Sequence, residues 1–205
     1  TLIGINKNGH FYLYNGDVDS IEHDTWENEE TCVSCAWVNG GIMPLDGSNK
    51  VIKLDCVFPV LHGQFGEDGT IQGLLEMAQI PYVGCRVMAS CTAMDKIYAK
   101  KLFDQANIPQ VPSLYVKKRY DDKLVVVDDE GRESFNVEME IYTHLGFPCF
   151  VKASRSGSSV GCYKVNSLTE LLPRLHEAAT YDRNVVVEKA INATELECAV
   201  IGNDD

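Results

Sequence analysis

The sequence predicts an α/β domain at residues 1–85, followed by an α+β domain at residues 86–205. Residues 51–84 follow the order strand, helix, strand, which is the pattern of a parallel α/β layer. After residue 112 the sequence consists of short apolar runs separated by turns, with helical segments between them. A chain of 205 residues that is 45% hydrophobic can bury a core in each of two small domains.

Turn signals and periodicity predict the elements of the first domain. Asn8-Gly9 lies between two strand-like runs, which indicates a hairpin. Residues 17–50 are polar and interrupted by glycine and proline, so we expect an irregular excursion with short strands. The apolar run 53–61 predicts a buried strand, and apolar residues from Ile71 to Ala78 then fall at helical spacing.

The second domain is predicted to combine helices with an antiparallel sheet. A long helix is expected at about 90–106 and a short one around 138–145. A third helix begins at the capping box Ser167-x-x-Glu170 and contains Pro173, which we expect to kink it. The strands are expected in apolar runs at 113–118, 123–129, 147–153 and 160–165, and in two runs within 184–202.

Composition excludes several classes of protein. The chain has 18 basic and 30 acidic residues, a net charge of −12, so we predict no nucleic-acid partner. The sequence shows neither a run of about 18 apolar residues nor a signal peptide, and we predict no membrane partner. The first residue is not methionine, the chain begins within a strand-like run and it stops just after another, so we expect the chain to be incomplete at both ends.

The eight cysteines are scattered, mostly in apolar surroundings, which predicts free thiols in a cytoplasmic protein. Cys32 and Cys35 form a C-x-x-C pair, for which a redox or a zinc role stays open. No second C-x-x-C accompanies this pair in the sequence, so a strong zinc signal is missing.

Two glycine-rich loops are candidate anion sites. The segment HGQFGEDG at 62–69 leads into a helix, and such a loop offers free backbone N–H groups and a positive dipole end to a carboxylate or phosphate. His62 adds a group that titrates near neutral pH. The alternative is a capped tight turn with a surface histidine. The segment KASRSGSSVG at 152–161 can fold amides and hydroxyls over phosphates, with Lys152 adding a point charge, or it can be a flexible hairpin loop.

Two further features are less specific when taken singly. Glu188 and Lys189 end an apolar strand, and Glu195 follows. Backbone N–H and carbonyl groups there could form hydrogen bonds with an adenine, and a carboxylate of this segment could bind the ribose hydroxyls. The alternative is a strand that simply leaves the core. Lys96 lies near Lys100 and Lys101 on the helix predicted at 90–106, where a solvated basic face is the usual meaning of such a cluster.

Taken together, four segments resemble the D-alanine–D-alanine ligase family of the ATP-grasp superfamily, which includes the D-alanine–D-serine and D-alanine–D-lactate ligases of vancomycin resistance. In chain order they are HGQFGEDGTIQG (62–73), MDK (94–96), FVKASRSGSSVG (150–161) and VVVEKAINATE (185–195). The resemblance runs from about residue 51 onward and is weak over 1–50. It implies a parallel-sheet pre-ATP-grasp domain, incomplete, at 1–85. It also implies the first, nucleotide-binding lobe of an ATP-grasp fold at 86–205, with the C-terminal lobe absent.

The resemblance also implies a reaction and its residues. ATP phosphorylates the carboxylate of one D-alanine, and the amine of a second D-alanine attacks the acyl phosphate, in peptidoglycan precursor synthesis. His62 and Glu67 would lie by the amino acids, and Ser158 would be catalytic. The ATP-binding residues would be Lys96, Lys152, Ser159, Glu188, Lys189, Ile191 and Glu195. Mg²⁺ is implied, with its carboxylate ligands beyond residue 205, and so is a cytoplasmic homodimer.

Several alternatives stay open at this point. The second substrate is D-alanine, D-serine or D-lactate. The protein is alternatively a different ATP-grasp ligase, which joins another carboxylate to an amine. A non-catalytic fragment that binds nucleotide belongs to a different class. For the 205 residues alone we predict negligible turnover and weak binding of ATP.

Overall fold

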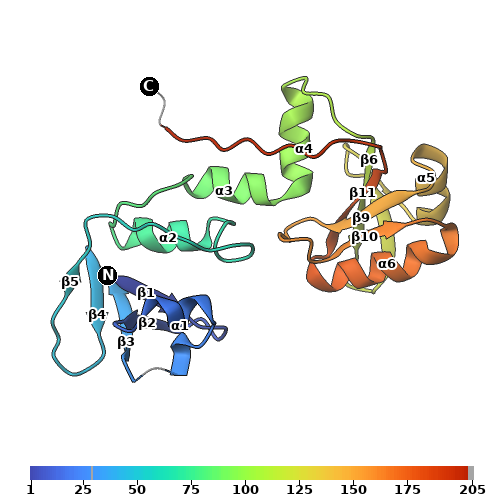
Figure 1. Cartoon of the computed structure of the whole chain (residues 1–205). Coiled ribbons are helices and arrows are strands. Elements are labelled where there is room, and N and C mark those ends of the chain that lie inside the picture. Colours follow the sequence, from blue (N-terminus) through green and yellow to red (C-terminus); the bar gives the residue numbers. More distant parts are fainter. Residues whose placement is uncertain (29, 203–205) are drawn as a thin grey trace. The chain divides into compact units, whose positions relative to one another are not determined.

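The structure, a computed structural model, describes residues 1–28 and 30–202 (Figure 1). The chain divides into two compact units, Thr1–Cys91 and Thr92–Asp205. Helix α3 (Val87–Met94) runs across the division. Within the described ranges, no helix is both long enough and apolar enough to cross a membrane.

Unit 1 contains a five-stranded antiparallel sheet in the order β1-β2-β3-β4-β5. Its strands are β1 (Leu2–Ile5), β2 (Phe11–Tyr14), β3 (Cys32–Val38), β4 (Gly41–Pro44) and β5 (Ile52–Lys53). Its helices are α1 (Val18–Glu22), the 3-10 helix η1 (Trp26–Asn28) and α2 (Thr70–Met77). The predicted hairpin is confirmed, because β1 pairs with β2 and the Asn6 side chain accepts hydrogen bonds from the amides of Asn8 and His10 at 3.0 Å.

The parallel α/β layer predicted at 51–84 is present only in part. The predicted helix is α2, whose Ile71 and Leu75 are buried in a small core. The buried strand predicted at 53–61 is wrong: β5 ends at Lys53, and parallel pairing appears as an isolated bridge between Val57 and Tyr82. Phe58 and Val60 are 72% and 71% exposed, because within the described ranges this run lies outside the sheet.

Unit 2 contains a six-stranded antiparallel sheet in the order β10-β9-β11-β6-β7-β8. Its strands are β6 (Ser113–Lys118), β7 (Leu124–Val127), β8 (Glu133–Ser134), β9 (Cys149–Ala153), β10 (Cys162–Val165) and β11 (Asn184–Lys189). Its helices are α4 (Lys96–Gln105), α5 (Val137–His144) and α6 (Leu168–Tyr181). Figure 1 shows these elements in yellow-green to red.

Helices α5 and α6 pack with the sheet of unit 2 around its main hydrophobic core. Alternate residues of the central strands enter this core, among them Val151 of β9 and Val185 and Val187 of β11. Successive side chains of a strand point to opposite faces. Lys152 and Glu188 therefore lie on the face turned away from this core.

The single helix predicted at 90–106 is wrong, because the chain forms α3 and α4 with a break at Asp95. Asp95 has an extended backbone (φ −85°, ψ 104°), and its carboxylate accepts hydrogen bonds from the amides of Ile97 (3.1 Å) and Tyr98 (3.4 Å). An aspartate that caps the first turn in this way starts a new helix.

The later elements were predicted with mixed success. Helix α6 is confirmed and includes Pro173, but the Ser167 side chain makes no cap bond, whereas Glu170 accepts from the amide of Asn166 at 2.9 Å. The second strand predicted within 184–202 is wrong. Residues 190–202, all of them described, contain no regular secondary structure, and their side chains are exposed from Ile191 onward.

Candidate functional site

Strand pairing brings two of the predicted site residues together. In the register of β9 and β11, Lys152 lies opposite Val186, so Glu188 is its diagonal neighbour on the same face. Diagonal neighbours on an antiparallel pair are within reach of long side chains. The Lys152 ammonium group donates to Glu188 Oε2 at 2.6 Å, and both side chains are at least partly buried.

Helix α4 adds two more lysines to this face. Lys96 and Lys100 are four residues apart and therefore share one side of the helix. The Lys100 ammonium group lies 2.9 Å from Glu188 Oε1. The Lys96 ammonium group donates to the carbonyl oxygens of Ser156 (2.5 Å) and Ser154 (3.4 Å). We call Lys96, Lys100, Lys152 and Glu188 the lysine cluster.

The lysine cluster carries more positive than negative charge. Burial lowers the pKa of Lys96, and the neighbouring ammonium group of Lys152 lowers it further. Burial alone would raise the pKa of Glu188, but hydrogen bonds from Lys152 and Lys100 outweigh it and keep that pKa below its usual range. The Glu188 carboxylate therefore pairs with two ammonium groups while Lys96 adds a third positive charge, an excess that suits an anion at this face of the sheet.

The serine loop, residues 154–161, begins at the lysine cluster and is anchored at its start. The Ser154 hydroxyl is buried and donates to Asp95 Oδ1 at 2.6 Å, which ties the loop to the start of α4. Arg155 forms a bidentate pair with Asp182, at 2.8 and 3.0 Å, and its amide donates to the same carboxylate at 3.0 Å. These contacts fix the end of the loop that follows Lys152.

The middle of the serine loop turns through left-handed backbone and faces solvent. Ser158 and Ser159 have φ values of +49° and +61°, and both are exposed. Strained backbone of this kind often occurs where a loop holds a ligand. Both hydroxyls are thus placed on an exposed turn that starts beside the lysine cluster.

The predicted adenine and ribose residues lie at the end of β11 and beyond it. Lys189 is the last residue of the strand, and its amide donates to the carbonyl of Pro112 at 3.0 Å. Ile191 (59% exposed) and Glu195 follow in the segment without regular structure. The fold places Lys189 next to Glu188, but it does not bring Ile191 or Glu195 into the lysine cluster through any described contact.

The glycine loop, residues 62–69 in unit 1, uses its own acids to bind its amides. Glu67 Oε2 accepts from the amide of Gly63 at 2.5 Å, and Asp68 accepts from the amides of Phe65 and Thr70 at 3.0 Å. Hydrogen bonds within the loop also engage the amides of the glycine and glutamate at 66 and 67. The predicted set of free N–H groups is therefore largely wrong, because the carboxylates at 67 and 68 compete for them.

Other contacts fix the glycine loop against its surroundings. The side-chain amide of Gln72 is buried and donates to the carbonyl of Gly66 at 3.0 Å. Gly69, with φ +91°, leaves no room for a side chain, because a Cβ there would lie 2.3 Å from the Cys91 sulfur. The predicted residue His62 is exposed at the start of this loop. Burial alone would raise the pKa of the Asp68 carboxyl, but hydrogen bonds from Phe65 and Thr70 outweigh it. The pKa is therefore lowered, which keeps Asp68 ionised.

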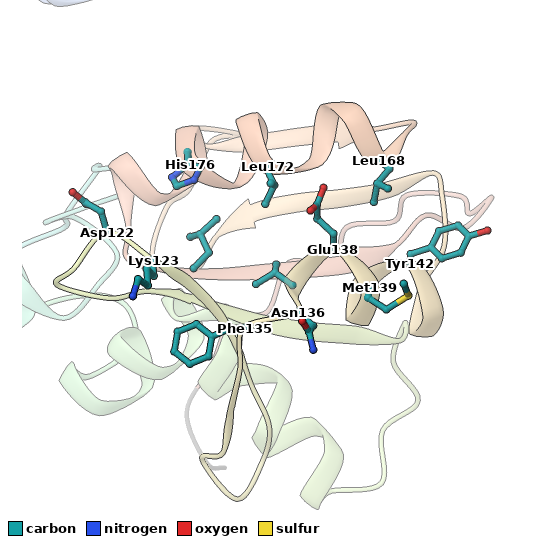
Figure 2. A pocket seen from close by; sticks show the side chains of 12 residues that line it. Asp122, Lys123, Phe135, Asn136, Glu138, Met139, Tyr142, Leu168, Leu172 and His176 are labelled. Atoms are coloured by element: carbon teal, nitrogen blue, oxygen red, sulfur yellow. The ribbon is translucent and has the colours of Figure 1, made fainter.

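Two cavities lie away from the predicted residues. A cavity of about 600 Å³ in unit 2 is lined by α5, α6 and neighbouring loops, with Leu172 and His176 on one side and Phe135 and Met139 on the other (Figure 2). A cavity of about 720 Å³ in unit 1 is lined mainly by apolar residues of β1 and the 54–61 segment. No predicted ligand residue lines either one.

Sequence reasoning missed Lys100 and Asp95 as parts of the site. A signal for Lys100 was present, since it stands four residues after Lys96. The described residues contain no group of three or more histidine, cysteine or acidic side chains that could hold a metal ion. The Cys32 thiol donates to the carbonyl oxygen of Trp26 at 3.3 Å, and Cys35 is buried.

Comparison with known proteins matches almost the whole chain to ligases. Family models described as D-ala D-ala ligase N-terminus and D-ala D-ala ligase C-terminus match residues 1–85 and 102–205. D-alanine--D-alanine ligases of Thermoanaerobacter pseudethanolicus and Acetivibrio thermocellus are each 43% identical over 100% of this chain and 55% or 56% of the relative. The chain thus spans about half the length of these curated relatives.

Solved structures give the same match. VanG D-Ala:D-Ser ligase from Enterococcus faecalis is 35% identical with a TM-score of 0.77, over 93% of this chain and 52% of that one. The D-alanine-D-alanine ligase from Coxiella burnetii is 30% identical with a TM-score of 0.76, over 93% of this chain and 53% of that one. The chain therefore has a fold of the ATP-grasp type seen in these ligases.

Proposed function

The chain belongs to the D-alanine–D-alanine ligase family, and on this premise we propose that it supplies the phosphate-binding surface of an enzyme that joins two D-alanines at the expense of ATP. The lysine cluster carries this proposal. Two ammonium groups bind the Glu188 carboxylate at a partly buried face, the Lys96 ammonium group adds a third positive charge nearby, and a triphosphate is the ligand that such an excess of positive charge fits. The dipeptide would serve peptidoglycan precursor synthesis.

In the proposed reaction the γ-phosphoryl group of ATP moves to a carboxylate oxygen of the first D-alanine, and ADP leaves. The amine of the second D-alanine then attacks the acyl carbon. The tetrahedral intermediate expels phosphate and loses the amine proton, which leaves the peptide bond. Negative charge accumulates on the phosphoryl oxygens during both steps, and Lys96 and Lys152 would offset it.

The other predicted residues enter as proposals of the same kind. Ser158 and Ser159, on the exposed turn of the serine loop, would contact the intermediate and the phosphates. Glu188, Lys189 and Ile191 would frame the adenine, and Glu195 would bind the ribose. His62, exposed at the glycine loop, would meet a D-alanine. Glu67 would act there mainly by holding the loop closed, since its carboxylate already binds the Gly63 amide.

Magnesium is the metal that this chemistry ordinarily uses. The described residues contain no set of carboxylates that fits it, so we assign no step to a metal held by this chain. A cytoplasmic homodimer remains part of the proposal, and analytical ultracentrifugation of the protein would test the dimer.

The direct test is phosphate release by the intact protein. With ATP and Mg²⁺ supplied, D-alanine should produce ADP, phosphate and the dipeptide in equal amounts, whereas omission of D-alanine should stop phosphate release. If phosphate release is independent of D-alanine, or absent with every amino acid offered, the proposal is wrong. The 205-residue chain serves as a second sample, and we expect it to bind ATP weakly without turnover.

A second candidate is a D-alanine–D-serine ligase, which the similarity to the Enterococcus faecalis enzyme favours. A D-alanine–D-lactate ligase is the third member of this set. Assays that combine D-alanine with D-serine or D-lactate separate the three, because the mixed product has its own mass. A dominant mixed product would replace the D-alanine–D-alanine assignment.

A further inference from the structure

We propose that Lys100 is a positioning residue for ATP: it neutralises one oxygen of Glu188, so that Lys152, on the other oxygen, stays free to bind a phosphate. This inference rests on the proposed ATP-binding function and assigns a role within that site.

The two lysines differ in what they can reach. The Lys100 side chain is 10% exposed and that of Glu188 is 12% exposed, whereas the Lys152 side chain is 29% exposed. The backbone around Lys100 is also fixed, since its carbonyl accepts from the Gln110 side chain at 2.8 Å, and Gln110 in turn donates to Asp104 at 2.7 Å. Lys100 is therefore a buried counter-ion, and Lys152 is the cation with access to a ligand.

The charge balance explains why a buried counter-ion matters. The groups that face Glu188 are Lys100 and Lys96 from α4, Lys152 from β9 and the Tyr115 side chain from β6. The Lys96 ammonium group is engaged by carbonyl oxygens. Without Lys100, Lys152 would be the remaining partner of the carboxylate. A phosphate that attracts Lys152 would then leave a buried carboxylate without a cation, which is strongly unfavourable.

The test is calorimetric binding of ATP, ADP and adenosine to the intact protein and its Lys100→Met variant. We expect the dissociation constants of ATP and ADP to rise by at least about tenfold, and that of adenosine to change by less than about twofold. The matched control is Lys101→Met, because the neighbouring Lys101 is 42% exposed and lies 3.6 Å from Asp129. This control should bind ATP as the wild type does.

Proton uptake is the readout that a merely structural role would not move. In Lys100→Met, Glu188 should take up a proton when ATP draws Lys152 away, so ATP affinity should increase as the pH falls from about 8 to 6, relative to the wild type. Titrations in buffers of different ionisation enthalpy count these protons. The charge-conserving variant Lys100→Arg keeps a cation on the Glu188 carboxylate, and its ATP affinity should stay within about threefold of wild type. It separates loss of the charge from loss of the native side chain, which keeps the test valid if Lys100→Met does not fold.

Each outcome decides something different. Equal losses for ATP and adenosine in Lys100→Met, or a loss of ATP affinity in Lys100→Arg as large as that in Lys100→Met, would overturn the positioning role while leaving the ATP site in place. An unchanged ATP affinity in Lys100→Met overturns it as well. Absence of ATP binding by the wild type would instead remove the proposed function itself.

Discussion

The glycine loop of unit 1 and the serine loop of unit 2, which begins at the lysine cluster, are both glycine-rich in sequence, yet their surroundings differ in what the polar groups already bind. In the glycine loop, Glu67 and Asp68 accept the amides that an external anion would need. In the lysine cluster a single carboxylate, Glu188, is shared between Lys100 and Lys152, and positive charge is left over.

This difference teaches that glycine content alone does not make an anion site. A glycine-rich loop that includes its own acids can close on itself. The serine loop is instead anchored by Asp95 at the start of α4 and by Asp182 at the end of α6, and its middle faces solvent. The charge that remains unpaired is the more informative signal for a ligand.

The largest expected difference concerns the aspartate that organises each loop. Asp182→Ala removes a buried carboxylate that accepts from Arg155 and from the amide of Asn184, and should lower the free energy of unfolding of unit 2 by about 3 kcal/mol. Asp68→Ala removes two loop bonds at a more exposed site and should destabilise unit 1 by about 1 kcal/mol.

Hydrogen exchange of β9 and β11 measures unit 2, and tryptophan fluorescence measures unit 1, because both tryptophans, Trp26 and Trp37, lie there. Equal losses from the two variants would contradict the view that unit 2 depends more heavily on its aspartate.

The next effect separates the two sites by ligand. Lys152→Met should raise the KM for ATP about thirtyfold, because the variant loses the hydrogen bond between the Lys152 ammonium group and a phosphate of ATP. Glu188 keeps its other cation, Lys100, in this variant. Glu67→Gln should leave the KM for ATP within about twofold and instead raise that for D-alanine. Steady-state kinetics with each substrate varied in turn provides the measurement. A Glu67→Gln variant with the larger effect on ATP would reverse the assignment of the two sites.

A glycine pair sharpens the account of the glycine loop. Gly69→Ala should cost about 2 kcal/mol, because φ is +91° and the new Cβ would meet the Cys91 sulfur at 2.3 Å. Gly73→Ala, four residues on in α2 with open space around it, should instead stabilise unit 1 by about 0.5 kcal/mol. Urea unfolding followed by tryptophan fluorescence compares them. If both variants shift the free energy of unfolding in the same direction, packing against Cys91 is not the reason that position 69 requires glycine.

The smallest effect is a pH dependence that should be steeper in unit 2. The folded state lowers the pKa of Asp182 and Glu188 there, and of Asp68 in unit 1. Groups with a lowered pKa contribute stability that is full above their unfolded pKa of about 4 and is lost as the pH falls through the folded value. Between about pH 5 and pH 3 we expect unit 2 to lose about 1 kcal/mol more than unit 1. The Asp182→Asn variant should flatten this loss, and an unchanged slope would count against Asp182 as its source.

Local signals in the sequence predicted several elements correctly. The Asn8-Gly9 turn, the periodicity of α2 and the position of α6 follow from near neighbours in the chain. The break at Asp95 could not be read from periodicity, because apolar spacing continues through it. The break depends on Asp95 as a helix cap, and the Asp95 carboxylate also accepts a hydrogen bond from the Ser154 hydroxyl, 59 residues away.

The candidate site shows the same division. Motif order pointed to Lys96, Lys152 and Glu188, and the sheet register places Lys152 beside Glu188. The part played by Lys100 depends on α4 facing the sheet of unit 2, which no local pattern specifies. The self-closure of the glycine loop was equally hidden, since the same acids could have faced solvent.

Strand β11 contains two kinds of position, fully buried valines and one charged residue of the lysine cluster. Val185 and Val187 pack into the core shared with α5 and α6, while Glu188 belongs to the opposite face. A saturation scan of 184–189 should accordingly show fitness that follows side-chain volume at the three fully buried valines, 185–187, and charge at 188. Substitutions that change stability and substitutions that change ligand binding would then fall at different positions of the same strand.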